Sequence, residues 1–114
     1  MNTTDLIDIV NKQMDESFPD NEIIPLFNMC LMDLSPLRDA PFTLLVDRHS
    51  EPELESFFRD MLVYYAIGHL QFKEEDYDER PDRLNRYYQR KQEYKSYLTK
   101  QAGPHEIEDV YGVI

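Results

Sequence analysis

Side chains that could bind a metal or transfer protons are present in this 114-residue chain, but their spacing does not support either chemistry. His49, His69 and His105 lie far apart, and none has a second metal ligand three or four residues away. The carboxylates of residues 74–79 lack the glycine and the spaced oxygen ligands of a calcium-binding loop. The sequence therefore predicts no bound metal, and we expect the acidic run to form a solvated turn.

The candidate nucleophiles have structural explanations. Cys30, the only cysteine, falls on the apolar side of a predicted helix, where a buried and inert thiol is the usual outcome. Ser50 and Glu53 have the spacing of a helix-capping box. The chain contains neither a glycine-rich phosphate loop nor a nucleophile elbow. We therefore predict no catalytic residue and no cofactor, and we expect that the protein is not an enzyme.

A stripe of arginine and tyrosine is the strongest polar candidate for function. Arg83, Arg86, Arg90 and Tyr97 recur at helical spacing and lie beside Tyr87. Such a stripe could follow a phosphate backbone or stack on bases, and it is also typical of protein interfaces. Because the chain has a net charge of −11, which repels nucleic acid, we predict that these residues form a subunit interface.

The C-terminal segment is unusually apolar for a tail. Gly103-Pro104 is a helix-stop signal, and the residues after it include five apolar side chains: Ile107, Val110, Tyr111, Val113 and Ile114. They either pack back onto their own domain or bind a partner as an added strand or anchor. We predict partner binding, and we divide the chain into a helical domain of residues 1–102 and an extended docking tail of residues 103–114.

Apolar periodicity predicts the elements that carry these residues. It indicates four helices, over about residues 3–16, 20–34, 51–72 and 82–100. Thr3 or Thr4 is expected to cap the first, and Pro25 is acceptable in the second only within its first turn. Residues 42–46 have the composition of a strand. The predicted fold is all-α: a small four-helix bundle with a long antiparallel helical hairpin, an irregular loop with a possible short strand, and an extended C-terminal tail.

The third predicted helix suggests assembly, because from Met61 onward all its sides are apolar. Such a helix is either central in its own fold or covered by a neighbouring molecule. Charge is also divided along the chain, with a net −12 over residues 1–80 and +4 over residues 81–102. The longest nearly uncharged stretch, residues 61–72, is too short to cross a bilayer, so we expect no membrane association and a soluble protein made inside a cell.

The arrangement resembles the head–tail connector, or head-completion adaptor, proteins of tailed bacteriophages. The resemblance covers about residues 5–100. It rests on the segments DLIDIV (residues 5–10) and IIPLF (residues 23–27), on an irregular loop followed by an amphipathic helix over residues 54–70, and on a tyrosine-rich helix over residues 84–98.

This resemblance implies a helical protein that forms a ring of about twelve subunits beneath the portal protein. The ring would extend the channel through which DNA passes without specific binding, and it would dock the next connector or tail component. Residues 107–114 would grip the portal. The protein would belong to the virion, at the head–tail junction, after assembly in the host cytoplasm. The alternative function is that of a small acidic inhibitor or DNA mimic that binds a basic host protein.

Overall fold

The computed structural model describes residues 1–73 and 80–102, and the predicted all-α class is confirmed there. Its elements are α1 (Thr3–Gln13), α2 (Asp20–Leu34), the 3₁₀ helices η1 (Ser35–Leu37) and η2 (Ser56–Phe58), α3 (Asp60–Lys73) and α4 (Arg80–Ala102). These described residues contain no strand.

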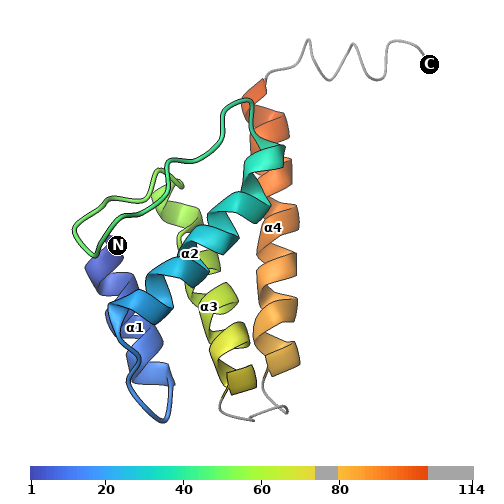
Figure 1. Cartoon of the computed structure of the whole chain (residues 1–114). Coiled ribbons are helices and arrows are strands. Elements are labelled where there is room, and N and C mark those ends of the chain that lie inside the picture. Colours follow the sequence, from blue (N-terminus) through green and yellow to red (C-terminus); the bar gives the residue numbers. More distant parts are fainter. Residues whose placement is uncertain (74–79, 103–114) are drawn as a thin grey trace.

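Helix α3 is the central element, since α1, α2 and α4 all pack against it. Six of its apolar side chains are buried: Met61, Leu62, Val63, Ala66, Ile67 and Leu70. The apolar character on all sides of this helix is therefore explained by the chain's own fold. Helices α3 and α4 lie side by side and run in opposite directions (Figure 1), as the predicted hairpin requires. With 14 residues, α3 is about 21 Å long, shorter than the helix predicted over residues 51–72.

The start of α1 is capped by Asn2, so the prediction that Thr3 or Thr4 caps this helix is wrong. The Asn2 side chain accepts a hydrogen bond from the Asp5 amide at 2.8 Å, and the Asp5 carboxylate accepts one from the Asn2 amide. Thr3 is buried instead, and its hydroxyl donates to the carbonyl oxygen of Ser50. This threonine therefore fastens the first helix to the long loop.

Pro25 lies beyond the first turn of α2, in its interior, which the sequence had not predicted. A proline there has no amide hydrogen to donate to the carbonyl of Asn21. The side chain of Pro25 is exposed, so water can satisfy that carbonyl at the helix surface. The buried residues on the opposite side, among them Ile23 and Phe27, keep the helix in place despite the lost bond.

The third helix begins at Asp60 and not at Glu51, and the predicted capping box is wrong. Ser50 Oγ accepts a hydrogen bond from the Val46 amide at 3.1 Å, so its oxygen is used by the preceding loop. The Glu53 carboxylate likewise binds backward, to the preceding loop. Residues 51–55 are not helical, because the preceding loop occupies the side chains that a cap would need.

Residues 42–46 do not form the predicted short strand. Side chains, not a second strand, satisfy their backbone: the Phe42 amide donates to Ser35 Oγ at 3.2 Å, the Thr43 amide to Glu53, and the Leu45 amide to Asn28 Oδ1 at 2.7 Å. Asn28 also donates to the Leu45 carbonyl at 2.9 Å. The extended segment is thus fixed to α2 without a strand partner.

Candidate interaction surface

Arg90 of α4 links the two helices of the hairpin. Its guanidinium donates to the Asp60 carboxylate, with nitrogen–oxygen distances of 3.1 and 3.2 Å, and to the Phe57 carbonyl oxygen, and it forms an ion pair with Glu93. The guanidinium carbon also lies 4.8 Å from the ring centroids of both Phe57 and Phe58. Burial acts to lower the pKa of Arg90, but the two carboxylates outweigh it and raise the pKa, so the side chain is a permanent cation.

Phe57 is exposed beside a packed aromatic cluster. Its side chain is 75% exposed, while its neighbour Phe58 is 3% exposed and meets it edge-to-face at 5.1 Å. Phe58 packs in turn against Tyr94 at 4.9 Å and Tyr97 at 5.2 Å. The hydroxyl of the buried Tyr94 donates to Glu55 at 3.1 Å. The helix predicted over residues 51–72 included Phe57. That prediction is wrong at this position, because Phe57 lies in η2, before α3 begins.

Three of the four residues predicted as a subunit interface share this surface. Arg90 and Tyr97 are half-buried in it, and Arg86 is exposed, with its guanidinium carbon 5.9 Å from the ring centroid of Tyr64. The fourth, Arg83, is half-buried one turn before Arg86. We call the surface formed by Phe57, Tyr64, Arg86, Arg90 and Tyr97 the Arg–aromatic face. The structure adds Phe57 and Tyr64 to the predicted stripe.

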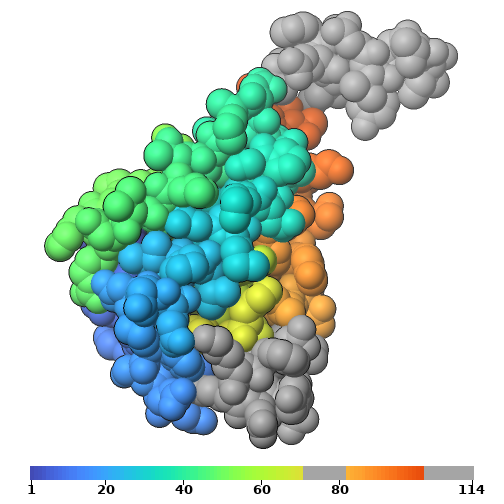
Figure 2. Space-filling view, in the orientation of Figure 1, coloured from blue at the N-terminus to red at the C-terminus, as the bar shows by residue number. Residues whose placement is uncertain are grey.

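A second apolar surface, which the sequence analysis missed, lies on the outer side of α2. Pro25, Met29 and Met32 follow one another at helical spacing there, with Met29 and Met32 exposed by 43% and 53%. Figure 2 shows this helix at the surface beside the segment that contains Leu44 and Val46. Val46, 87% exposed, lines a shallow groove of about 390 Å³ together with Pro25. The sequence alone could have indicated this second surface, because α2 has apolar residues on two of its sides.

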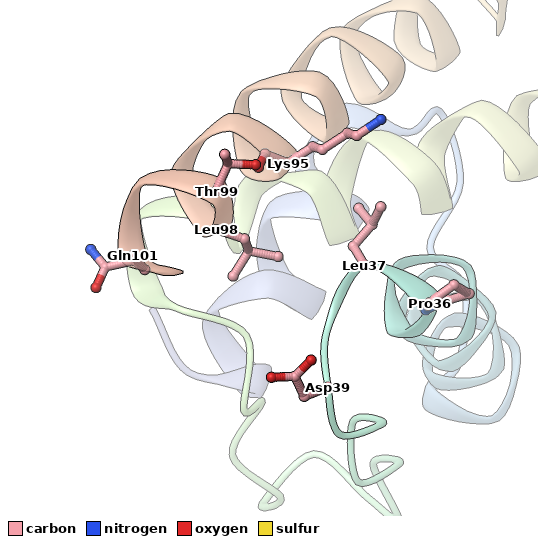
Figure 3. Close-up of a pocket in the computed structure, with 7 residues that line it drawn as sticks. All are labelled: Pro36, Leu37, Asp39, Lys95, Leu98, Thr99 and Gln101. Atoms are coloured by element: carbon pink, nitrogen blue, oxygen red, sulfur yellow. The ribbon is translucent and has the colours of Figure 1, made fainter. Parts of the chain in front are cut away.

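The end of α4 contributes to a larger open groove of about 570 Å³. Figure 3 shows Leu98 of α4 and Leu37 of η1 extending into the space between the helix and the segment after α2. Both leucines are half-buried. The other residues that line the groove are Pro36, Asp39, Lys95, Thr99 and Gln101. Among the described residues, the charged groups of this lining are Asp39 and Lys95.

The buried Tyr87 joins a polar network at the edge of the core. The hydroxyl of Tyr87 donates to the Asp33 carboxylate, which also accepts a bond from Lys91 Nζ at 3.0 Å. Burial acts to raise the pKa of Asp33, but the bonds from Tyr87 and Lys91 outweigh it and lower the pKa. Cys30 is fully buried, and burial raises the pKa of its thiol, so it cannot supply a thiolate nucleophile near neutral pH.

The other candidates for chemistry do not come together. His49 is exposed in the loop, whereas His69 stacks on Tyr65 with ring centroids 4.4 Å apart. His105 and the acidic residues 74–79 lie outside the described residues, as do all five predicted partner-binding residues of the tail. Within residues 1–73 and 80–102, no three histidine, cysteine or acidic side chains are grouped to hold a metal ion.

No protein-family model, no curated protein and no solved structure matches this chain. Among the helices of the described ranges, none combines the length and the apolarity needed to span a bilayer. The surfaces described above are therefore the basis for an inference about function.

Proposed function

We propose that this protein is a non-catalytic assembly adaptor whose Arg–aromatic face binds another copy of the same chain. The observation that supports the proposal is the exposure of Phe57 on a segment that Phe58 and Arg90 contact. An aromatic ring buries about 150–250 Å² when it is covered. Because Phe58 and Arg90 already hold the backbone and one side of the ring, little entropy is lost on binding. Aromatic residues and arginines together are typical binding hot spots.

The division of charge supports a contact between unlike surfaces. Residues 81–102, which include most of α4, have a net charge of +4, and residues 1–80 have a net charge of −12. A contact between the basic part of one copy and the acidic part of the next is heterologous. Repetition of such a contact produces a ring when the rotation between copies closes.

The resemblance of residues 5–100 to connector proteins gives this adaptor its most specific form. In that form the ring, of about twelve subunits, lies beneath the portal in the virion of a tailed bacteriophage after assembly in the host cytoplasm. It extends the DNA channel and docks the next connector or tail component, and the apolar tail residues 107–114 grip the portal. The overall acidic charge suits a channel through which DNA slides without sticking.

Particle mass in solution tests the proposal. We expect native mass spectrometry of the full chain to give a multiple of 13.7 kDa. Phe57→Ser is expected to return the mass to that of a monomer with an unchanged circular dichroism spectrum, because this ring contributes little to the core. The matched control is Tyr88→Ser. It removes a different exposed aromatic ring, which lies on α4 and outside the Arg–aromatic face. Arg86→Glu is expected to weaken assembly more than folding.

A second candidate, an acidic inhibitor that imitates DNA, is favoured by one observation. Helix α1 and the turn after it display exposed carboxylates at Asp5, Asp8, Asp15 and Glu16. Such a protein would stay monomeric and bind a basic protein with strong salt dependence. A wild-type mass of 13.7 kDa at all concentrations, combined with salt-sensitive binding to a basic protein, would replace the adaptor proposal with this one.

A further inference from the structure

The groove beside α2 is apolar at its centre and acidic at its edge. Ile24 and Leu45 are buried beneath it, whereas Val46 lines it with 87% of its surface exposed. Among the described residues of the lining, the two charged ones, Asp20 and Asp47, are both carboxylates. A ligand for this groove would therefore combine an apolar group with positive charge.

Arg48 offsets only part of this negative charge. Its guanidinium donates to both oxygens of Asp20, with nitrogen–oxygen distances of 2.7 and 2.8 Å. Asp8 of α1 acts on the same guanidinium and contributes to the raised pKa of Arg48. The Asp47 carboxylate accepts a hydrogen bond from the His49 amide at 2.9 Å, and it has no ion-pair partner in the described part of the chain. Three carboxylates thus lie around one cation, and the edge of the groove remains acidic.

The Arg–aromatic face has the opposite pattern. Phe57 is 75% exposed, and the guanidinium carbon of Arg90 lies 4.8 Å from its ring centroid. Arg86 is exposed on the same face, where it contacts the Tyr64 ring and forms no ion pair with any described carboxylate. An aromatic ring beside arginines complements an apolar groove bordered by carboxylates, and aromatic anchors that fill pockets are typical of interface hot spots.

The groove and the ring lie on different sides of the molecule. Lys91 of α4 points toward α2, where it pairs with Asp33 at 3.0 Å. Arg90, the preceding residue, points toward η2 and donates to the Phe57 carbonyl oxygen. Because consecutive residues of a helix point about 100° apart, α2 and the Arg–aromatic face lie on different sides of α4. One copy can therefore offer its ring to one neighbour and its groove to another, as a heterologous contact requires.

We propose that the Phe57 ring of one copy inserts into the α2 groove of the next copy, over Pro25 and Val46, with Arg86 directed toward Asp47. This pairing rests on the proposed adaptor function, and it names the surface that the Arg–aromatic face binds. Insertion removes the ring and the exposed Val46 side chain from water together, and the ring alone buries about 150–250 Å². The charged groups at the edge then fix the orientation of the two copies and accelerate their encounter.

Mixing two variants that each lack one side of the contact tests this pairing. Val46→Lys places a charge in the groove, and Phe57→Ser removes the ring; both side chains are exposed, so the core stays intact. Native mass spectrometry should give 13.7 kDa for each variant alone and twice that mass for the equimolar mixture, which contains one intact ring and one intact groove. Asp47→Lys, at another exposed position of the lining, should behave as Val46→Lys does. Leu44→Lys, at an exposed position of the same segment outside the groove, is the matched control and should keep the wild-type mass.

The results distinguish this pairing from the adaptor role itself. If the wild-type protein assembles but the mixture of the two monomeric variants stays at 13.7 kDa, the ring binds a different surface and only the pairing is overturned. Assembly of both groove variants to the wild-type mass overturns the pairing in the same way. A wild-type mass of 13.7 kDa at all concentrations overturns the adaptor role, and the pairing with it.

Discussion

Replacing Gly68 by alanine should weaken the hairpin that supports the Arg–aromatic face. Gly68 lies in α3, and a Cβ atom added there would be 2.7 Å from Leu84 Cδ2 and 2.8 Å from Leu84 Cγ. Contacts this short force the neighbour to move. Because Cγ is involved, rotation of the leucine tip alone does not relieve the clash. Overpacking of this kind costs about 1–3 kcal/mol. Alanine recovers about 1 kcal/mol through its higher helix propensity, so we expect a net loss of about 1 kcal/mol.

A double-mutant cycle separates these two effects. In the background Leu84→Ala the obstructing atoms are gone, and Gly68→Ala should then stabilise the protein by about 1 kcal/mol. Urea unfolding followed by circular dichroism gives the four free energies, and a change of this size shifts the melting temperature by about 4 °C. If Gly68→Ala stabilises the protein while Leu84 is present, the close approach of α3 and α4 at this point is refuted. If Gly68→Ala changed the free energy of unfolding equally with Leu84 and with Leu84→Ala, the close approach of the two helices would also be refuted.

Three further predictions concern the core and helix α2. Burial raises the pKa of both Tyr87 and Tyr94. Their contribution to the free energy of unfolding is therefore complete below the unfolded pKa of about 10 and decreases as the pH rises further. In thermal melts, Tyr94→Phe should make the fall in melting temperature at alkaline pH less steep. Cys30 should not react with a thiol reagent until the protein unfolds. Titration of the thiol in increasing urea would measure this, and a reaction in buffer alone would contradict its burial. Pro25→Ala should stabilise α2 by about 1–2 kcal/mol, because it restores a backbone hydrogen bond. An unchanged or lower melting temperature would mean that the proline does not destabilise the helix at this position.

The parts of the fold that follow from neighbouring residues could be predicted from the sequence. The bounds of α2 and α4 were close to those expected, since helical periodicity and stop signals act within a few residues of each other. The burial of Cys30 followed from the same periodicity. Local patterns therefore sufficed for three of the helices and for the core side of α2.

The errors occurred where side chains bind the backbone of a neighbouring loop in place of the partners that local rules assign to them. Ser50 and Glu53 have the spacing of a cap, but the backbone of residues 42–46 binds both side chains. Asn28, from α2, supplies both a donor and an acceptor to Leu45 and so replaces a strand partner. No local rule predicts which of these bonds forms, because the outcome depends on how the loop packs against α2.

The sequence predicted the arginines of the Arg–aromatic face but not its exposed ring, Phe57. Helical spacing alone aligned Arg86, Arg90 and Tyr97, and this alignment holds in the structure. The predicted helix ran without a break through residues 51–72, so it gave no reason to single out Phe57, which lies in η2 and is exposed.

The packing of α3 within the fold changes the argument for assembly. The apolar sides of α3 do not require a partner, since α1, α2 and α4 cover them. Within the described residues, the large apolar side chains that remain exposed are Met1, Met29, Met32, Leu44, Val46, Phe57 and Tyr88. Scattered apolar residues are normal on a protein surface, so their number alone argues little. Phe57 differs from the others because Arg90 and Phe58 fix its base. An adaptor role for this chain therefore depends on that one ring more than on the total apolar area.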